Sequence, residues 1–365
     1  MAKGKAAKKP KVPEASDYLA DLIKLRGKNE PEESFSFFED ALFGEPKERM
    51  PTGILELDKF TGGGYPLGRM IEIAGWEGAG KSTLIDQGIA QCQKMGGIAH
   101  LIDNCEGRDV SYTRKLGVAT STLITDEVET LEEGFNGIDK ILTVQERKEA
   151  ELRKAGIEPP LTLIAWDSLG GTPSEAEFVG TADDDHVATG ARVIGLNFKR
   201  ILSRLAKLRA VFIFTNHFYK TIGQGISTLV SYGGKGPRYY TSIRLWIRRT
   251  NEIKVGGRVV GFEVEAKLKK TKVGPYRPPV TLGLVHSCGI DNSYSLFKWG
   301  KDHGIGGDYP DHRWIEQRGA WCYLVPPGYE TITFGESFIG LGKVLAENPE
   351  IYRDFIAAFM ADENA

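Results

Sequence analysis

The 365-residue sequence contains no long apolar run and little cysteine. No stretch approaches the roughly 20 apolar residues that a transmembrane helix needs. The N-terminus, MAKGKAAKKPKV, is basic and lacks the apolar stretch of a secretory signal, so we expect no membrane partner. The four cysteines (Cys92, Cys105, Cys288 and Cys322) are widely spaced without a CxxC pair, which disfavours a disulfide framework or zinc site and favours a reducing cytoplasm.

The sequence also has almost no net charge, since 47 Lys and Arg oppose 49 Asp and Glu. Taken over the whole chain, this balance argues against nucleic-acid binding. The charges are unevenly distributed, however: residues 213–277 hold 13 Lys and Arg and 3 acids, a formal charge of +10. A basic stretch that includes the Gly-rich segment 218–234, which we expect to be a long loop, is typical of polyanion binding.

From residue 51 onward, short apolar runs alternate with helical stretches, which predicts an α/β fold with a mostly parallel sheet. The expected strands are 70–75, 98–103, 161–167 and 210–216, with a helix at about 81–95. The composition of residues 146–158 predicts a charged helical insertion with a solvated face. Near residue 293 the composition becomes rich in turn residues, and 336–361 reads as two helices separated by Asn348-Pro349.

Three parts of the chain follow from this pattern. Residues 1–50 are expected to hold a basic tail, an amphipathic helix near 17–26 and a linker. Residues 51–292 form the core, and 293–365 a small C-terminal domain. The apolar face of the N-terminal helix packs either on its own domain or on a neighbouring subunit, and the pattern alone leaves both open.

The strongest motif is GWEGAGKS at residues 75–82, which matches GxxxxGK[ST] between a predicted strand and a predicted helix. The Gly-rich backbone and the helix N-terminus suit the phosphates of a nucleotide. Lys81 is expected to reach the β- and γ-phosphates, and Ser82 to ligate Mg²⁺. The predicted phosphate-binding residues are Gly75, Trp76, Glu77, Gly78, Ala79, Gly80, Lys81, Ser82 and Thr83.

Three further predicted strands end in polar residues. Asp167 ends the strand 161–167, where a carboxylate can hold Mg²⁺. Asp103 and Glu106 follow another strand, and either could position an attacking water or merely cap the next turn. Asn216 and His217 follow a third, where they could sense the γ-phosphate, although a lone histidine is more often structural.

Beyond these motifs, the chain resembles the RecA family of recombinases, phage-encoded forms included, from about residue 51 to the C-terminus. The resemblance is carried by PTGILELDKFTGGGYPLGR (51–69), Asp109, Tyr112, RKLGV (114–118), the segment 215–249, GAWCYL (319–324) and LAENPEI (345–351). It implies a RecA-like P-loop NTPase core and a small α+β C-terminal domain. It also implies a DNA-dependent ATPase that uses ATP and Mg²⁺, forms helical filaments on single-stranded DNA, and catalyses homologous pairing and strand exchange with duplex DNA.

The resemblance also implies roles for individual residues. Asp109, Tyr112 and His286 would belong to the ATP site, and Lys270 and Lys272 would reach the γ-phosphate from the adjacent subunit. The helix near 17–26 would mediate oligomerisation. DNA loops would lie at 178–187 and 218–234. The predicted DNA-contacting residues are Val187, Arg192, Lys199, Lys220, Ile222, Gly223, Gly233, Gly234, Lys235 and Arg238. Mediator and single-strand-binding proteins are candidate partners, in the cytoplasm of a bacterium or of a phage-infected host.

The sequence departs from the family pattern at the expected catalytic glutamate. Ungapped counting places Cys105 there and Glu106 one position later, so either the turn shifts by one residue or hydrolysis is altered. We therefore assign catalysis to Glu106 together with Lys81, Lys270 and Lys272. Two alternatives are a hexameric helicase or branch-migration motor with the same core fold, and an ATP-switched DNA-binding protein with weak hydrolysis.

Overall fold

The computed structural model describes residues 45–104, 107–180, 189–223, 226–302, 304–306, 309–318, 321–335 and 337–362. The chain divides into two compact units, residues 1–45 and 46–365, and every element below belongs to the second. The predicted tail and N-terminal helix lie outside the described residues, as do Cys105, Glu106 and Val187. The domain boundary near residue 292 stays a prediction. Within the described residues, no helix has both the length and the apolarity of a membrane span.

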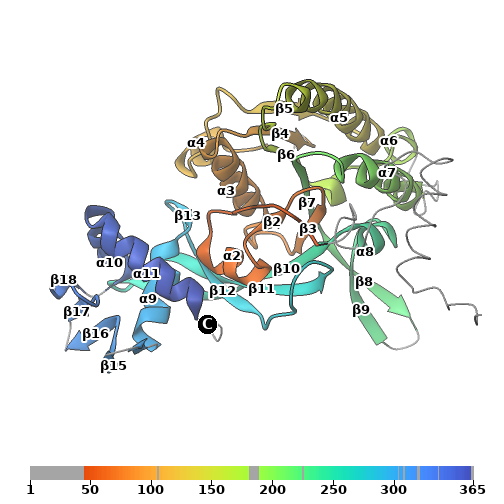
Figure 1. The fold of residues 1–365 in the computed structure, drawn as a ribbon. Helices are drawn as coiled ribbons and strands as arrows, with labels where there is room; N and C mark the ends of the chain where they lie inside the picture. The colour runs from red at the N-terminus through yellow and green to blue at the C-terminus, as the bar shows by residue number, and fades with distance from the viewer. Residues whose placement is uncertain are drawn as a thin grey trace, which may run out of the picture. The chain divides into compact units, whose positions relative to one another are not determined.

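A nine-stranded sheet in the order β13-β12-β11-β10-β3-β7-β6-β4-β5 forms the centre of this unit (Figure 1). Six neighbouring strands run parallel to one another, which confirms the predicted α/β class. They are β3 (Met70–Gly75), β4 (Ile98–Asp103), β5 (Ile124–Glu127), β6 (Thr162–Asp167), β7 (Ala210–Asn216) and β10 (Ile243–Val255). The antiparallel strands β11 (Arg258–Thr271), β12 (Val280–Val285) and β13 (Gly289–Ile290) extend the sheet.

Helices cover both faces of the sheet, because its central strands carry apolar side chains on each face. The helix α3 (Lys81–Lys94) buries Leu84 and Ile89 in one core. The helices α5 (Leu131–Lys154) and α7 (Thr189–Leu205) form the other, where Phe198 packs edge-on against Phe135 and Phe212. Figure 1 shows α3 on the opposite side of the strands from α5 and α7.

Two sequence-based expectations need correction. Residues 146–154 are the last part of the continuous helix α5, not an insertion, and Glu149 is buried there, where it accepts hydrogen bonds from Gln145 (3.1 Å) and the backbone N–H of Arg209 (2.9 Å). The expected loop 218–234 contains a two-stranded antiparallel hairpin, β8 (Phe218–Gly223) and β9 (Ile226–Ser231). Its β-branched residues favour extended backbone, but the expectation of a loop rested on its glycines.

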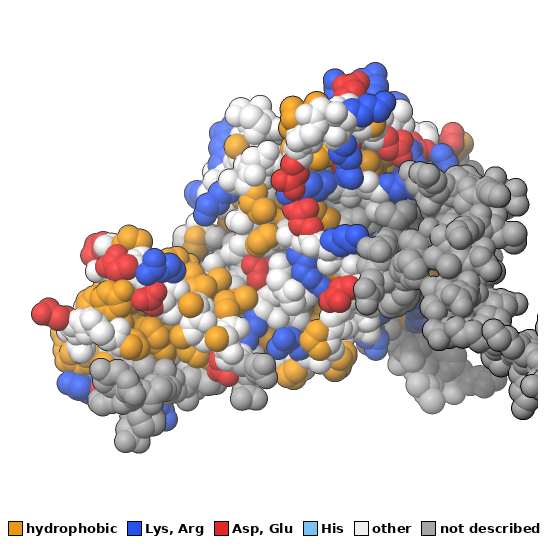
Figure 2. All heavy atoms as spheres, in the orientation of Figure 1, with side chains coloured by type: hydrophobic (Ala, Val, Ile, Leu, Met, Phe, Trp, Pro, Cys, Tyr) orange, Lys and Arg blue, Asp and Glu red, His pale blue; other side chains and the backbone are white. Residues whose placement is uncertain are grey.

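The C-terminal residues combine helices and short strands around their own core. Trp314 stacks on Phe355 with ring centroids 4.6 Å apart, and Trp299 packs against Phe359. As expected, two helices meet at Asn348-Pro349. Apolar side chains gather over these helices in Figure 2, whereas charges of both signs intermingle over the visible part of the core. The elements are α9 (Asn292–Asp302), β14 (Gly304–Gly306), β15 (Tyr309–Arg313), β16 (Ile315–Arg318), β17 (Trp321–Leu324), β18 (Ile332–Gly335), α10 (Phe338–Glu347) and α11 (Pro349–Ala361).

Short elements complete the unit. Among them, α2 connects the sheet region to the C-terminal helices, since the Lys59 ammonium donates to the Phe359 carbonyl over 2.6 Å. These elements are β1 (Arg49–Met50), α2 (Leu55–Thr61), β2 (Tyr65–Pro66), α4 (Val110–Lys115), η3 (Leu169–Gly171), α6 (Glu175–Val179) and α8 (Gly236–Tyr240).

Candidate functional site

The parallel strands bring the predicted site residues to one edge of the sheet. β3 leads into the Gly-rich motif at residues 75–82, which we call the P-loop. β4 ends at Asp103, β6 at Asp167 and β7 at Asn216. The register pairs Asp103 with Asp167, and Ala74 with Asn216. Ligands of open α/β sheets bind outside the carboxyl ends of the strands, so this edge is the expected position of a site.

The P-loop requires its glycines for two reasons. Gly78 and Gly80 have φ angles of +68° and +91°, which favour glycine. A Cβ on Gly75 would lie 2.7 Å from the Ile247 carbonyl oxygen. The Lys81 ammonium donates to the carbonyls of Gly75 (3.1 Å) and Trp76 (3.0 Å). Because Gly80 supplies no side-chain cap, the first turn of α3 presents backbone N–H groups suited to an anion.

A cavity of about 210 Å³ lies beside the start of α3. It brings together six of the residues singled out from the sequence, namely Ser82, Thr83, Asp103, Asp109, Tyr112 and Asp167. Asp109 also caps α4 by accepting hydrogen bonds from the backbone N–H groups of Ser111 and Tyr112. His286 is not part of this lining; among described residues its ring packs near Phe262 and its backbone N–H donates to Val260. The lining residues are Ser82, Thr83, Asp86, Asp103, Gly107, Arg108, Asp109, Tyr112, Thr113 and Asp167.

The donors in this cavity suit Mg²⁺ when phosphates complete its coordination. Ser82 contributes a hydroxyl and Asp167 a carboxylate to the lining, and such hard oxygen ligands are the ones that Mg²⁺ prefers. No three His, Cys, Asp or Glu side chains converge on a metal position anywhere in the described part of the chain. The described side chains alone therefore do not form a complete metal site.

Arg108 also lines the cavity, and the sequence analysis did not predict a role for it. Its guanidinium pairs with Asp86, with Asp103 (3.3 Å) and with Asp167 (2.6 Å). Burial alone would lower the pKa of Arg108, but these three carboxylates raise it above its ordinary value. Arg108 and Asp86 belong to no motif, so only the folded structure shows that they meet.

The residues at the end of β7 contact the base of the β8–β9 hairpin. The buried Asn216 amide donates to Glu72 (2.8 Å) and to the backbone carbonyl of Tyr232 (2.9 Å), which follows the hairpin. The His217 Nε2 lies 3.0 Å from the Ser168 hydroxyl, next to Asp167. These contacts connect the end of β6 with the hairpin, and the γ-phosphate-sensing role of Asn216 and His217 stays a prediction.

Glu72 holds three strands together inside the sheet. It lies on β3 and is fully buried, and it pairs with Arg244 of β10 while accepting the hydrogen bond from Asn216 of β7. Arg244 in turn donates to the Ser231 hydroxyl at the end of β9 over 2.8 Å. Thus the P-loop strand and the hairpin share one buried polar network.

A row of three aromatic rings, whose contacts the sequence did not predict, lies beside this network. The Trp76 ring of the P-loop lies 5.7 Å from the Phe218 ring, which in turn lies 4.7 Å from the Trp246 ring on β10. Both contacts are edge-on, the favourable arrangement for aromatic rings. The first residue of β8 therefore touches the P-loop directly.

The predicted γ-phosphate lysines lie beside α8. The Lys270 ammonium donates to the carbonyls of Arg238 and Thr241, and that of Lys272 to the carbonyl of Tyr239. Burial, with the nearby charges of Lys272 and Arg244, lowers the pKa of Lys270 to about 8. Neither lysine lines the cavity of its own subunit.

Four predicted DNA-contacting cations lie on two packed helices. Arg192 and Lys199 are exposed on α7, and Lys235 and Arg238 are exposed on or next to α8. Gly233, Gly234 and Gly236 permit close packing, since a Cβ on Gly234 would lie 3.2 Å from Ala191. The structure describes the backbone of Lys220, Ile222 and Gly223 within β8 but not their side chains.

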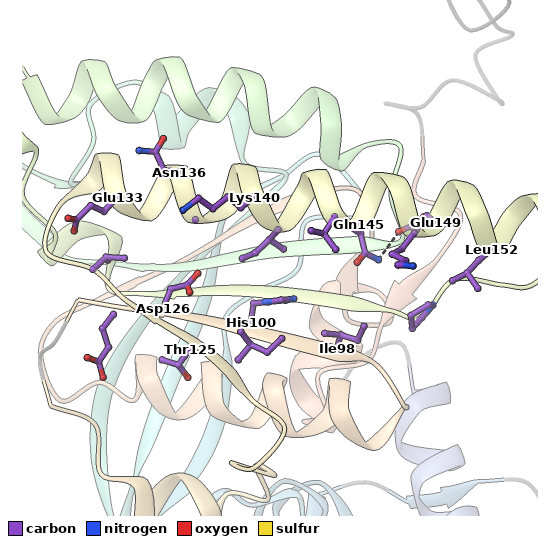
Figure 3. A pocket seen from close by; sticks show the side chains of 18 residues that line it. Ile98, His100, Thr125, Asp126, Glu133, Asn136, Lys140, Gln145, Glu149 and Leu152 are labelled. Atoms are coloured by element: carbon purple, nitrogen blue, oxygen red, sulfur yellow. Dashed lines mark hydrogen bonds between the residues drawn. The ribbon is translucent and has the colours of Figure 1, made fainter.

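A groove of about 800 Å³ follows the edge of the sheet at β5, which has no second neighbouring strand among the described residues (Figure 3). Figure 3 shows Lys140 and Gln145 of α5 above Asp126 and His100 of the two outer strands. Its lining includes the exposed apolar side chains of Ile98, Ile124 and Val144. An unpaired strand edge beside apolar surface is a typical position for association with another chain.

Comparisons with known proteins give consistent results. The family model described as the RecA N-terminal domain matches residues 44–291. The chain is 33% identical to Protein RecA of Thermotoga neapolitana over 309 residues, which cover 84% of this chain and 82% of the relative. It is 31% identical to Protein RecA of Thermotoga sp. (strain RQ2) over 344 residues, covering 94% and 90%. Protein RecA of Paenarthrobacter aurescens is 29% identical over 311 residues, covering 85% and 82%.

Replacing Glu72 by Gln tests the buried network. We expect a loss of about 3–5 kcal/mol in the free energy of unfolding, because the Arg244 guanidinium would keep its burial and lose its counter-ion. Glu265→Gln is the matched control, since the Arg248–Glu265 pair is exposed and contributes at most about 1 kcal/mol. Urea unfolding followed by circular dichroism measures both variants, and equal losses would contradict the assignment.

Proposed function

This chain belongs to the RecA family of recombinases, and on that premise we propose that it is a DNA-dependent ATPase whose ATP site is the P-loop edge of the sheet. The observation that carries the proposal is the cavity that joins Ser82, Asp167 and Tyr112 beside an uncapped helix N-terminus. Lys81 and the P-loop backbone would bind the phosphates, and Ser82 and Asp167 would hold Mg²⁺. Bound Mg²⁺ would neutralise charge on the β- and γ-phosphate oxygens. Glu106 stays the predicted base.

We propose that the hairpin β8–β9 and the cations on α7 and α8 bind the DNA backbone. Arg192 and Lys199 make no ion pair with another described residue, so both charges are available to phosphates. Their neighbours Arg200 and Arg204, in contrast, are paired with Asp139 of α5. Contacts of this kind carry no sequence information, which suits a recombinase that must accept any sequence.

ATP hydrolysis with and without single-stranded DNA tests the proposal. We expect DNA to stimulate the wild type, and Lys81→Ala to lose at least about 100-fold in rate because the charge that faces the phosphates is removed. Lys94→Ala, at the exposed end of the same helix, should keep the wild-type rate.

Electron microscopy with a non-hydrolysable ATP analogue completes this test. Helical filaments on single-stranded DNA are the expected result, and rings would favour the helicase reading. The absence of both DNA stimulation and filaments would overturn the proposal. Filaments without single-turnover hydrolysis would instead support an ATP-switched DNA-binding protein.

We further propose that Lys270 and Lys272 act on the γ-phosphate of the neighbouring subunit. They lie together on β11 and the turn that follows it, away from the cavity of their own subunit. Their only described acceptors are backbone carbonyls, which a phosphate could replace. Such cations supplied in trans would make hydrolysis depend on assembly.

The lowered pKa of Lys270 gives this role a pH signature. Its protonated form attracts phosphate, so we expect DNA-stimulated hydrolysis to fall as the pH rises through about 8. A phosphate next to Lys270 favours the protonated ammonium and so raises the pKa of Lys270. The decline in hydrolysis therefore moves to higher pH when phosphate is bound. Lys270→Arg should remove the decline, since arginine stays protonated. Lys269→Arg is the control, and a Lys270→Arg profile that matches the wild type would contradict the role.

We propose that the groove at β5 receives the N-terminal segment of a second copy. The predicted helix near 17–26 carries Leu19, Leu22, Ile23 and Leu25 on one face, which matches the apolar side chains in the groove. Self-association through this edge would also cover the free strand β5.

Ile124→Asp tests this surface, because it places a charge among the apolar side chains of the groove, next to Asp126. We expect filaments to be lost while binding of a fluorescent ATP analogue is retained. Ile157→Asp is the matched control, since Ile157 is 55% exposed against 49% for Ile124 and lies outside the groove. Equal filament formation by the two variants in electron micrographs would contradict the proposal.

A further inference from the structure

Arg108 occupies the position between the acids at the ends of β4 and β6. Three different nitrogens of its guanidinium contact three different carboxylates, those of Asp86, Asp103 and Asp167. The Arg108 side chain is 16% exposed, and the side chains of Asp86 and Asp167 are 4% and 9% exposed. Pairs buried to this extent are only weakly screened by solvent and salt.

Both oxygens of the Asp167 carboxylate are engaged by protein donors. Oδ1 accepts a hydrogen bond from the Thr215 hydroxyl at 2.5 Å, and Oδ2 accepts from Arg108 at 2.6 Å. Asp86 is held in a similar way, since its Oδ2 accepts from the Thr113 hydroxyl at 2.9 Å. The carboxylate that we expect to hold Mg²⁺ is therefore already satisfied by a cation of this chain.

The three acids are arranged for a guanidinium and not for a metal ion. A guanidinium spreads its donors over a planar fork, whereas Mg²⁺ needs oxygens at about 2.0–2.1 Å around one point. No group of acids in the described ranges converges in that manner. Removing Arg108 should therefore free Asp167 without creating a new metal site.

We propose that Arg108 competes with Mg²⁺ for Asp167, so that the metal enters the site only together with the phosphates of a nucleotide. Two cations at one carboxylate repel each other, and phosphates add the negative charge and the oxygen ligands that favour the metal. This inference rests on the proposed ATP site. Arg108 is thus a positioning residue that links metal binding to nucleotide binding.

Two variants remove the guanidinium. Arg108→Gln keeps a polar side chain but leaves Asp86 buried without its cation, which can destabilise the fold. The double variant Arg108→Met with Asp86→Leu replaces the buried pair by apolar side chains, an exchange that is often neutral or stabilising. Arg114→Gln is the control, since the Arg114 side chain is exposed and contacts Thr120 and not the three acids.

The experiment measures binding of a fluorescent ATP analogue at fixed concentration while Mg²⁺ is titrated. We expect the Mg²⁺ concentration at half-saturation to fall about tenfold in both variants, within the usual range of coupling between two ligands. Arg114→Gln should match the wild type. In EDTA, all proteins should bind the analogue equally, because Arg108 acts on the metal and not on the phosphates.

Each other result overturns the inference in a recognisable way. An unchanged Mg²⁺ requirement in both folded variants shows that Arg108 does not compete with the metal. A weaker affinity in EDTA assigns Arg108 to the phosphates, and a higher Mg²⁺ requirement shows that it orients Asp167 for the metal. If the wild type binds no nucleotide, the proposed ATP site itself fails, which is a separate outcome.

Discussion

The buried ion pair between Glu72 and Arg244 is the interaction on which the functional half of the sheet depends. Glu72 lies three residues before the P-loop, and its two oxygens are divided between Arg244 on one neighbouring strand and Asn216 on the other. Its charge cannot be solvated, so each partner is held in one position. Through Ser231 and Tyr232, the same partners hold the base of the hairpin. The P-loop strand and the base of the hairpin are therefore joined by one buried polar network.

The same principle organises the acidic side of the cavity beside α3. Asp103 and Asp167 at the strand ends and Asp86 on α3 would repel one another if they were unpaired, and Arg108 compensates all three. This compensation offsets part of the cost of placing several acids together in a largely buried position. A cation that binds Asp167 must therefore replace the contact that Arg108 already makes with this carboxylate.

Local patterns predicted most of the fold, because they depend on neighbouring residues. The strands 70–75 and 210–216 and the helix after Lys81 were identified to within a residue from apolar runs and the P-loop motif. The hairpin at 218–231 was missed because its glycines outweighed its β-branched residues in the interpretation. Arg108 and the ring contacts of Phe218 have no sequence signature, since partners such as Asp167 and Trp246 are brought to them only by the tertiary fold.

Two sets of contacts join the P-loop edge of the sheet to the hairpin, and they differ in how easily they can move. The Glu72–Asn216 network is fully buried, and its displacement would leave charges without partners, so it resists movement. Trp76 is instead 46% exposed, and its edge-on contact with Phe218 can slide without loss of a hydrogen bond. The hydrogen bond between His217 and Ser168 is also only partly buried. A change at the P-loop or at Asp167 would therefore reach the start of β8 through Phe218 and His217, while the buried network holds the end of β9 in place.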